Sequence, residues 1–145
     1  MTMTKTRIVC FGDSNTWGYN PKNATRYPEE VRWTGILEEM LGNEYKIIEE
    51  GQNGRTIATD DPCEGERNGI KVIVPCIESQ KPFDLLILML GTNDLKSKFH
   101  YTASDVAGEM QQMLEKSRGL STSRPTLRLM NRASWKVASV MNSPK

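Results

Sequence analysis

The sequence predicts an α/β fold built around a parallel β-sheet. Strand-like and helix-like runs alternate over residues 1–116 of the 145-residue chain, which is typical of such folds. Residues 84–90, Asp-Leu-Leu-Ile-Leu-Met-Leu, are almost continuously apolar, as expected of a central strand that is covered on both faces. Each predicted strand is followed by a polar loop that contains glycine. The length suits one domain and is too short for two.

The first half of the chain is expected to supply two strands with a helix between them. Residues 7–11, Arg-Ile-Val-Cys-Phe, form a short run typical of a buried first strand. Residues 30–41 place apolar side chains at roughly helical spacing, which predicts an amphipathic helix. Residues 45–48 are the second predicted strand, and residues 49–56 are expected to form the loop after it.

The second half is expected to add one strand and at least one helix. Residues 68–80 fit a helix by their apolar spacing, although Pro75 would kink it, so this segment is ambiguous. Residues 84–90 are the strongest predicted strand. Residues 102–105, Thr-Ala-Ser-Asp, resemble a capping box that opens a further helix. The buried side of that helix would carry Val106, Met110, Met113 and Leu114.

The charge distribution divides the chain near residue 116. Residues 1–116 carry all 18 acidic residues and 13 of the 19 basic ones, whereas residues 117–145 carry only basic charge. We therefore expect a domain over 1–116 and a basic, Ser- and Arg-rich tail over 117–145. The tail could be disordered, or it could be a non-native C-terminus such as a shifted reading frame; residues 126–130 could form a weak strand. A nucleic-acid-binding arm is disfavoured because the basic residues are spread out.

The composition favours a cytoplasmic protein without a cofactor. The polar N-terminus contains no signal-peptide core, and no apolar run reaches the length of a membrane helix. Three cysteines are an odd number and form no Cys-x-x-Cys pair, which argues against a disulfide framework. With a single histidine in the chain, we expect no metal site.

Three glycine-containing loops follow the three predicted strands. They span residues 12–18 (Gly-Asp-Ser-Asn-Thr-Trp-Gly), 51–56 (Gly-Gln-Asn-Gly-Arg-Thr) and 91–94 (Gly-Thr-Asn-Asp). In an open parallel sheet, ligand sites lie outside the carboxyl ends of the strands. We therefore expect these loops to meet at one edge of the sheet, although they are far apart in sequence.

The residue types in these loops suit nucleophilic catalysis on an acyl group. Ser14 offers a hydroxyl beside the free N–H groups of a helix N-terminus. Gly54 offers an unshielded backbone N–H, and Asn93 offers a side-chain amide, so the three could form an oxyanion hole. Each residue also has a purely structural interpretation: a helix cap for Ser14, a turn glycine for Gly54, and a loop-stabilising amide for Asn93.

These loops resemble the conserved blocks of the SGNH/GDSL hydrolases. Residues 11–18 are similar to the first block, Gly54 to the second-block glycine, and residues 91–94 to the third block. Residues 49–51, 55–56, 60–62 and 89–94 also resemble the branch of bacterial aryl esterases and acyltransferases with perhydrolase activity. The resemblance covers about residues 7–115.

The resemblance implies a flavodoxin-like three-layer α/β/α sandwich and a serine esterase or acyltransferase acting on small carboxylic esters. Ser14 would be the nucleophile, and Ser14, Gly54 and Asn93 the oxyanion donors. Asp13 and Trp17 are the expected substrate contacts, although ordinary packing is an equally good interpretation of Trp17.

A flavin or nucleotide binder is disfavoured, because Asp13 would place negative charge where a phosphate should lie. A small ester is the expected partner, with neither nucleic acid nor a membrane, and a homo-oligomer is an open alternative.

The sequence departs from the family at its C-terminal end. The family completes its catalytic triad with an Asp-x-x-His segment, but this chain has no aspartate after Asp105 and no histidine after His100. The resemblance therefore predicts a C-terminally incomplete fold and an enzyme impaired by loss of its base. The alternative is a truncated, non-catalytic relative. His100 is expected to be a surface or helix-entry residue, and a missing strand would leave the edge of the 84–90 strand open unless residues 126–130 cover it.

Overall fold

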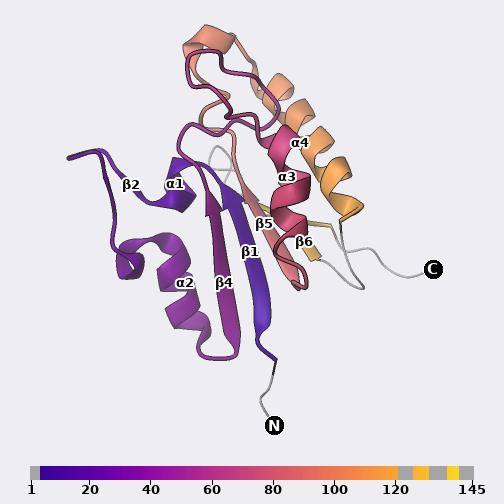
Figure 1. Cartoon of the computed structure of the whole chain (residues 1–145). Helices are drawn as coiled ribbons and strands as arrows, with labels where there is room; N and C mark the ends of the chain where they lie inside the picture. Colours follow the sequence, from indigo (N-terminus) through magenta and orange to yellow (C-terminus); the bar gives the residue numbers. More distant parts are fainter. Residues whose placement is uncertain (1–3, 121–125, 131–136, 141–145) are drawn as a thin grey trace.

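A five-stranded sheet forms the centre of the molecule, with strand order β4-β1-β5-β6-β7 (Figure 1). The computed structural model describes residues 4–120, 126–130 and 137–140. Four strands are parallel, and the last is antiparallel to its neighbour. The strands are β1 (Thr6–Gly12), β4 (Tyr45–Gly51), β5 (Leu85–Met89), β6 (Thr126–Met130) and β7 (Val137–Val140).

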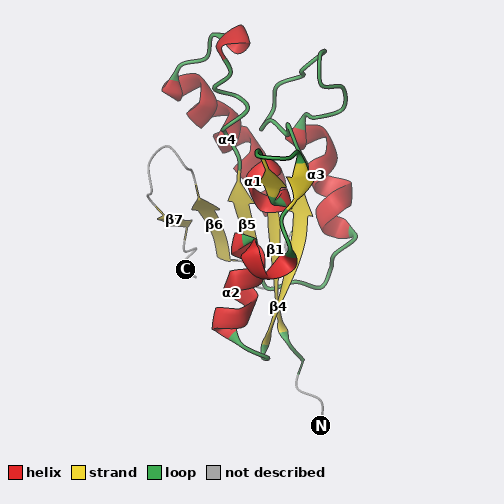
Figure 2. Ribbon diagram, turned by 90° about the vertical axis from the view of Figure 1, so that its left-hand side faces the viewer, coloured by secondary structure: helices red, strands yellow, loops and turns green. Residues whose placement is uncertain are grey.

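Helices cover both faces of the sheet, which confirms the predicted three-layer α/β/α arrangement. Helix α2 packs on one face, and helices α3 and α4 pack together on the other (Figures 1 and 2). The helical elements are α1 (Ser14–Trp17), η1 (Glu29–Val31), α2 (Trp33–Leu41), α3 (Gly69–Glu78), η2 (Ser97–Phe99) and α4 (Ala103–Arg118). A short hairpin, β2 (Tyr19–Asn20) and β3 (Thr25–Arg26), follows α1. No helix among the described residues is long and apolar enough to cross a membrane.

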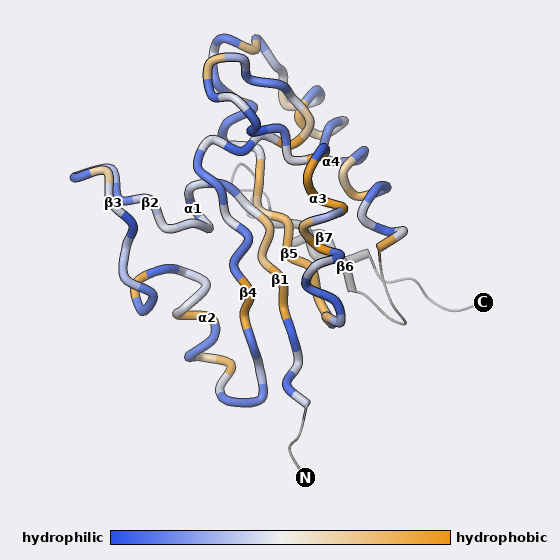
Figure 3. The backbone as a smooth tube through the Cα atoms, in the orientation of Figure 1, coloured by the Kyte–Doolittle hydropathy of each residue, from blue (hydrophilic) through white to orange (hydrophobic). Residues whose placement is uncertain are grey.

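The alternation of side chains along β1 divides the core between the two faces. Val9 and Phe11 are fully buried in the cluster beneath α3 and α4. Ile8 and Cys10 point the other way and pack with Trp33 of α2. Figure 3 shows the apolar character concentrated along the middle of β1 and β5, in agreement with a sheet covered on both faces.

The first half of the chain differs from the sequence prediction in two places. Helix α2 begins at Trp33, because residues 29–31 form a separate 3-10 turn, η1. Strand β4 extends to Gly51, three residues beyond the predicted end. Its polar residue Glu49 is accommodated because Arg26 and Arg32 pair with the carboxylate at 3.0 and 2.8 Å. These long-range ion pairs leave no local pattern in the sequence.

Both helices on the α3/α4 face begin at side-chain caps. Asn68 accepts the Ile70 N–H at 3.2 Å at the start of α3, and Pro75 lies inside this helix without ending it. At α4, Thr102 Oγ1 accepts the Asp105 N–H at 3.2 Å, while the Asp105 carboxylate accepts the Thr102 N–H at 2.7 Å. This confirms the predicted capping box.

The region after residue 116 contributes to the sheet. Helix α4 continues to Arg118, and β6 pairs with β5 in parallel from Thr126 opposite Leu85 to Leu129 opposite Leu88. The segment 126–130 therefore covers the edge of β5, which is the alternative to an open edge that the sequence offered. Residues 121–125, 131–136 and 141–145 lie outside the described part of the chain. The domain boundary at 116 and the character of the 117–145 tail accordingly stay predictions.

Candidate active site at the carboxyl edge of the sheet

Three neighbouring strands end at the same level of the sheet. Gly12, the last residue of β1, lies opposite Gly51 of β4 on one side and Met89 of β5 on the other. The loops that carry Ser14, Gly54 and Asn93 therefore leave the sheet from one edge, as the sequence predicted. This is the edge where parallel α/β sheets hold their ligands.

Ser14 is the first residue of α1, a single helical turn that begins directly after β1. Its N–H has no carbonyl acceptor within the helix, because the first N–H groups of any helix lack one. Asp13 is the cap of this turn: its Oδ1 accepts the Asn15 N–H at 2.9 Å. The side chain of Ser14 is half-buried, so the hydroxyl is held by a short rigid element and still reachable.

Two glycines allow α1 to lie against the ends of β1 and β4. A Cβ atom on Gly51 would fall 2.3 Å from the Trp17 backbone nitrogen, and one on Gly12 would fall 2.2 Å from Thr16 Oγ1. Side chains at these two positions would push the turn away from the sheet. The glycines of the first two loops therefore set the position of Ser14.

Gly54 lies in a turn closed by the Arg55 N–H, which donates to the Gln52 carbonyl at 3.2 Å. The φ angle of Gly54 is 78°, a left-handed conformation that favours glycine. A Cβ atom here would make only ordinary contacts, at 3.4 Å or more from Glu64 and Arg67. The requirement for glycine at this position thus comes from the backbone conformation.

Asn93 is buried in the loop after β5, and its amide is oriented by the second loop. Its Nδ2 donates to the Arg55 carbonyl at 3.0 Å. A carboxamide has two N–H donors, and this bond accounts for one of them. The next residue, Asp94, accepts the Ile57 N–H at 2.9 Å. The second and third loops are therefore joined at two successive residues.

Arg55 joins the first and second loops, a role that the sequence analysis did not assign to it. Its Nη1 donates to the carbonyls of Gly12 and Glu50, at 3.0 and 2.5 Å. The guanidinium also lies 4.1 Å from the centroid of the Phe11 ring. The residue is only 7% exposed, and this burial lowers the pKa of its side chain. Since Asn93 bonds the Arg55 carbonyl, one residue contacts all three loops.

A cavity of about 400 Å³ lies beside Ser14. Much of its wall is aromatic or apolar, which suits the hydrocarbon part of an ester. It also includes Arg32, one of the two arginines paired with Glu49. The lining residues are Ser14, Asn15, Gly18, Tyr19, Tyr27, Val31, Arg32, Trp33 and Met89.

Trp17 and Asp13, the expected substrate contacts, have packing and capping partners in the structure. Trp17 is not among the residues that line the cavity; the Arg26 guanidinium lies 4.9 Å from its ring centroid and donates to its carbonyl at 2.6 Å. Asp13 is 1% exposed and accepts both the backbone and side-chain N–H of Asn15. The expected substrate-binding roles of Asp13 and Trp17 stay predictions.

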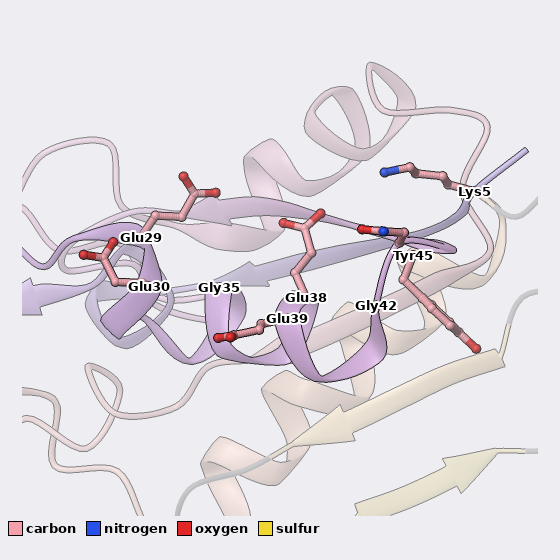
Figure 4. Close-up of a pocket in the computed structure, with 9 residues that line it drawn as sticks. Lys5, Glu29, Glu30, Gly35, Glu38, Glu39, Gly42 and Tyr45 are labelled. Carbon is pink, nitrogen blue, oxygen red and sulfur yellow. The ribbon is translucent and has the colours of Figure 1, made fainter.

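A larger hollow of about 510 Å³ lies at the opposite end of the strands (Figure 4). Lys5, which precedes β1, and Tyr45, the first residue of β4, form part of its wall. Glu38 of α2 also lines it and is paired with Lys46 at 3.2 Å. The residues around it include no serine, cysteine or histidine, and none of the three glycine-containing loops contributes to its wall.

The three loops at this edge of the sheet contain no histidine. The single histidine, His100, is exposed at the end of η2, six residues after Asp94. This agrees with the expectation that it is a surface residue. Within the described ranges, no cluster of three or more histidine, cysteine, aspartate or glutamate side chains is arranged to hold a metal ion.

The fold and the three loops at its rim define an SGNH-type hydrolase architecture. The sequence profile of the GDSL-like Lipase/Acylhydrolase family matches residues 10–143. The chain therefore belongs to this family, as its motifs predicted. No curated protein sequence matches the chain significantly.

Several solved esterases share this fold. The native aryl esterase of M. smegmatis is 36% identical, with a TM-score of 0.81 over 86% of this chain and 62% of its own. Est24, a carbohydrate acetylesterase from Sinorhizobium meliloti, is 41% identical, with a TM-score of 0.77 over 88% of this chain and 63% of its own. A carbohydrate acetylesterase family member from the same organism is 32% identical, with a TM-score of 0.81 over 87% and 62%. This chain thus spans less than two thirds of the length of these esterases.

Proposed function

We propose that the chain is a serine esterase or acyltransferase for small carboxylic esters, in which Ser14 is the nucleophile. Ser14 N–H, Gly54 N–H and the second N–H of the Asn93 amide are the proposed oxyanion donors. The observation that carries the proposal is the bonding of the three loops through Arg55 at one edge of the sheet. Similarity to an aryl esterase and to carbohydrate acetylesterases supports an ester substrate.

The proposed reaction begins with attack of the Ser14 hydroxyl oxygen on the ester carbonyl carbon. The carbonyl π electrons move to oxygen, and the three donors stabilise the resulting oxyanion. When the tetrahedral intermediate collapses, the bond to the leaving alcohol breaks and an acyl-Ser14 ester remains. Water or a second alcohol then takes the acyl group. The cavity lined by Tyr27, Trp33 and Met89 would hold the apolar part of the substrate.

The rate is expected to be low because no histidine assists Ser14. The hydroxyl proton would have to pass to water or buffer, and a serine without an adjacent base is a weak nucleophile. Serine hydrolases that lose a triad member keep a residual rate of about 10³-fold or more over water, from the oxyanion hole and binding. We therefore propose slow turnover by this chain.

The alternative is a non-catalytic chain that keeps the fold and binds acyl ligands. It is favoured by the lack of an Asp-x-x-His segment after Asp105. Hydrolysis of p-nitrophenyl acetate by the chain and by its Ser14→Ala variant separates the two. Faster release of nitrophenol by the unaltered chain supports the esterase, whereas equal rates support the non-catalytic alternative.

A further inference from the structure

Asp94 and Glu109 form a buried pair of carboxyl groups behind Asn93. Asp94 is fully buried, and one of its oxygens accepts the Ile57 N–H at 2.9 Å. Its carboxyl group also hydrogen-bonds the Glu109 carboxyl on α4. The remaining oxygens, Asp94 Oδ2 and Glu109 Oε2, are shielded from solvent, and no amide or hydroxyl donor of the described residues reaches them.

A hydrogen bond between two carboxyl groups requires a proton, because carboxylate oxygens only accept. Two ionised carboxylates side by side in a buried site repel each other, so one of them stays protonated. Burial, reinforced by the hydrogen bond to Glu109, raises the pKa of Asp94 from 3.8 to about 7. The group is therefore poised to titrate near neutral pH, unlike an ordinary aspartate.

The pair connects the site loops to helix α4. Glu109 accepts a hydrogen bond from the Thr59 hydroxyl, and Thr59 Oγ1 lies 2.9 Å from the Tyr101 hydroxyl. Thr59 and Ile57 belong to the loop after β4, whereas Asp94 belongs to the loop after β5. These contacts link three segments of the chain around the two carboxyl groups.

The other charged groups of these segments have partners of their own. Asp61, in the loop after β4, pairs with Lys98 at 2.6 Å and with Lys96 at 3.8 Å. Asp105, near the start of α4, bonds the Thr102 backbone and hydroxyl. His100, in the segment before α4, is exposed. The groups that act on the Asp94 carboxyl are thus the Glu109 carboxyl, the Ile57 N–H and its own backbone, and no cation is among them.

We propose that Asp94 and Glu109 share one proton, and that this proton holds Asn93 and the turn from Gly54 to Ile57 in register with Ser14. Glu109 is a positioning residue that acts through Asp94, with no contact to substrate. The consequence for acyl transfer rests on the proposed function, whereas the shared proton itself does not. Loss of the proton as the pH rises through neutrality would separate the two carboxylates and loosen the Asn93 loop.

The test is an NMR titration of the whole chain, following the carboxyl carbon of Asp94 and the side-chain amide of Asn93. We expect both signals to change with one midpoint near 7. In Glu109→Gln, the new amide can donate to an ionised Asp94, so the midpoint should fall below that of the unaltered chain and the Asn93 amide should stop responding near neutral pH. Glu115→Gln is the matched control, since Glu115 is exposed on the same helix and bonds Gln111.

An Asp94 midpoint at the ordinary 3.8, or an Asn93 amide that ignores the Asp94 titration, would overturn the proposal. If Glu109→Gln does not fold, the titration of Asp94 and Asn93 in the unaltered chain still tests the proposal. Repeating the titration in Ser14→Ala separates the shared-proton proposal from the proposed esterase function. The shared proton should persist in this variant whether or not Ser14 is a nucleophile. If Glu109 had a purely structural role, Glu109→Gln would change the free energy of unfolding equally at every pH. It would leave the titration midpoints of the Asp94 and Asn93 signals unchanged.

Discussion

The side-chain amide of Asn93 donates a hydrogen bond to the backbone carbonyl of Arg55, over 3.0 Å, and both residues are buried. The Arg55 side chain in turn reaches the carbonyl of Gly12, just before Ser14. Residues from three parts of the sequence are thereby fixed relative to one another. These two hydrogen bonds hold the loops of the candidate site in place within the folded chain.

Replacing Arg55 by methionine should destabilise the chain. The variant keeps an apolar side chain but removes the donors to the Gly12 and Glu50 carbonyls. Leaving buried acceptors without a donor costs about 1–3 kcal/mol. Urea unfolding measures the loss, and Arg118→Met on the exposed end of α4 should change the unfolding free energy by no more than about 0.5 kcal/mol. Equal losses in the two variants would contradict the role of Arg55.

Gly51→Ala should displace α1 and lower stability. The added Cβ would fall 2.3 Å from the Trp17 backbone nitrogen. Because this is a backbone atom and not the end of a flexible side chain, it cannot easily move away. Overpacking of this kind typically costs about 1–3 kcal/mol. Gly108→Ala, in the open middle of α4, is the control and should stabilise by about 0.5–1 kcal/mol. Thermal unfolding should show a lower midpoint temperature for Gly51→Ala and a higher one for Gly108→Ala.

The three cysteines should differ in reactivity toward a thiol reagent at neutral pH. Cys63 is exposed, whereas Cys10 is fully buried and Cys76 is half-buried. Burial raises the pKa of both Cys10 and Cys76 to about 12, so almost none of either is present as the reactive thiolate. Mass spectrometry after a short treatment of the native chain should find label on Cys63. Rapid native labelling of Cys10 would show that the β1 face is not packed against α2.

The unfolding free energy should fall as the pH rises toward neutrality, because the folded state holds a proton on Asp94 that the unfolded chain releases. With the pKa of Asp94 raised to about 7, this contribution is fully present below 3.8 and is lost as the pH passes through about 7. Urea unfolding at a series of pH values should show this decline in the unaltered chain. In Asp94→Asn the decline should be reduced, and an unchanged slope would contradict the assignment to Asp94.

The strands and helices whose signal is local could be predicted from the sequence. The apolar run ending at Leu90 predicted β5, and the Thr102–Asp105 pattern predicted the start of α4. The extension of β4 through Glu49 could not be predicted, because it depends on ion pairs with Arg26 and Arg32 that only the fold creates. Residues 29–31 were assigned in part to a helix because their spacing does not distinguish an α-helix from a 3-10 turn.

The positions of Ser14, Gly54 and Asn93 at one sheet edge followed from motifs placed after strands. The residues that hold them there did not. Arg55 bonds the Gly12 carbonyl 43 positions away, and such a contact leaves no periodic pattern. Asp94 and Glu109 lie on different elements and meet only through packing. A charged residue next to a motif glycine, as in Gly54-Arg55, is the one sequence signal that could have indicated the role of Arg55.

Acetylation of Ser14 tests the central claim most directly. Under the proposed function, in which no histidine assists Ser14, an acetyl-Ser14 ester formed from p-nitrophenyl acetate should accumulate, and intact-mass and peptide mass spectrometry would detect it. Asn93→Ala should slow its formation by about 10²–10³-fold, as expected for loss of an oxyanion donor. Acetyl groups found elsewhere but not on Ser14, or equal rates with and without the Asn93 amide, would contradict a shared site at this edge of the sheet.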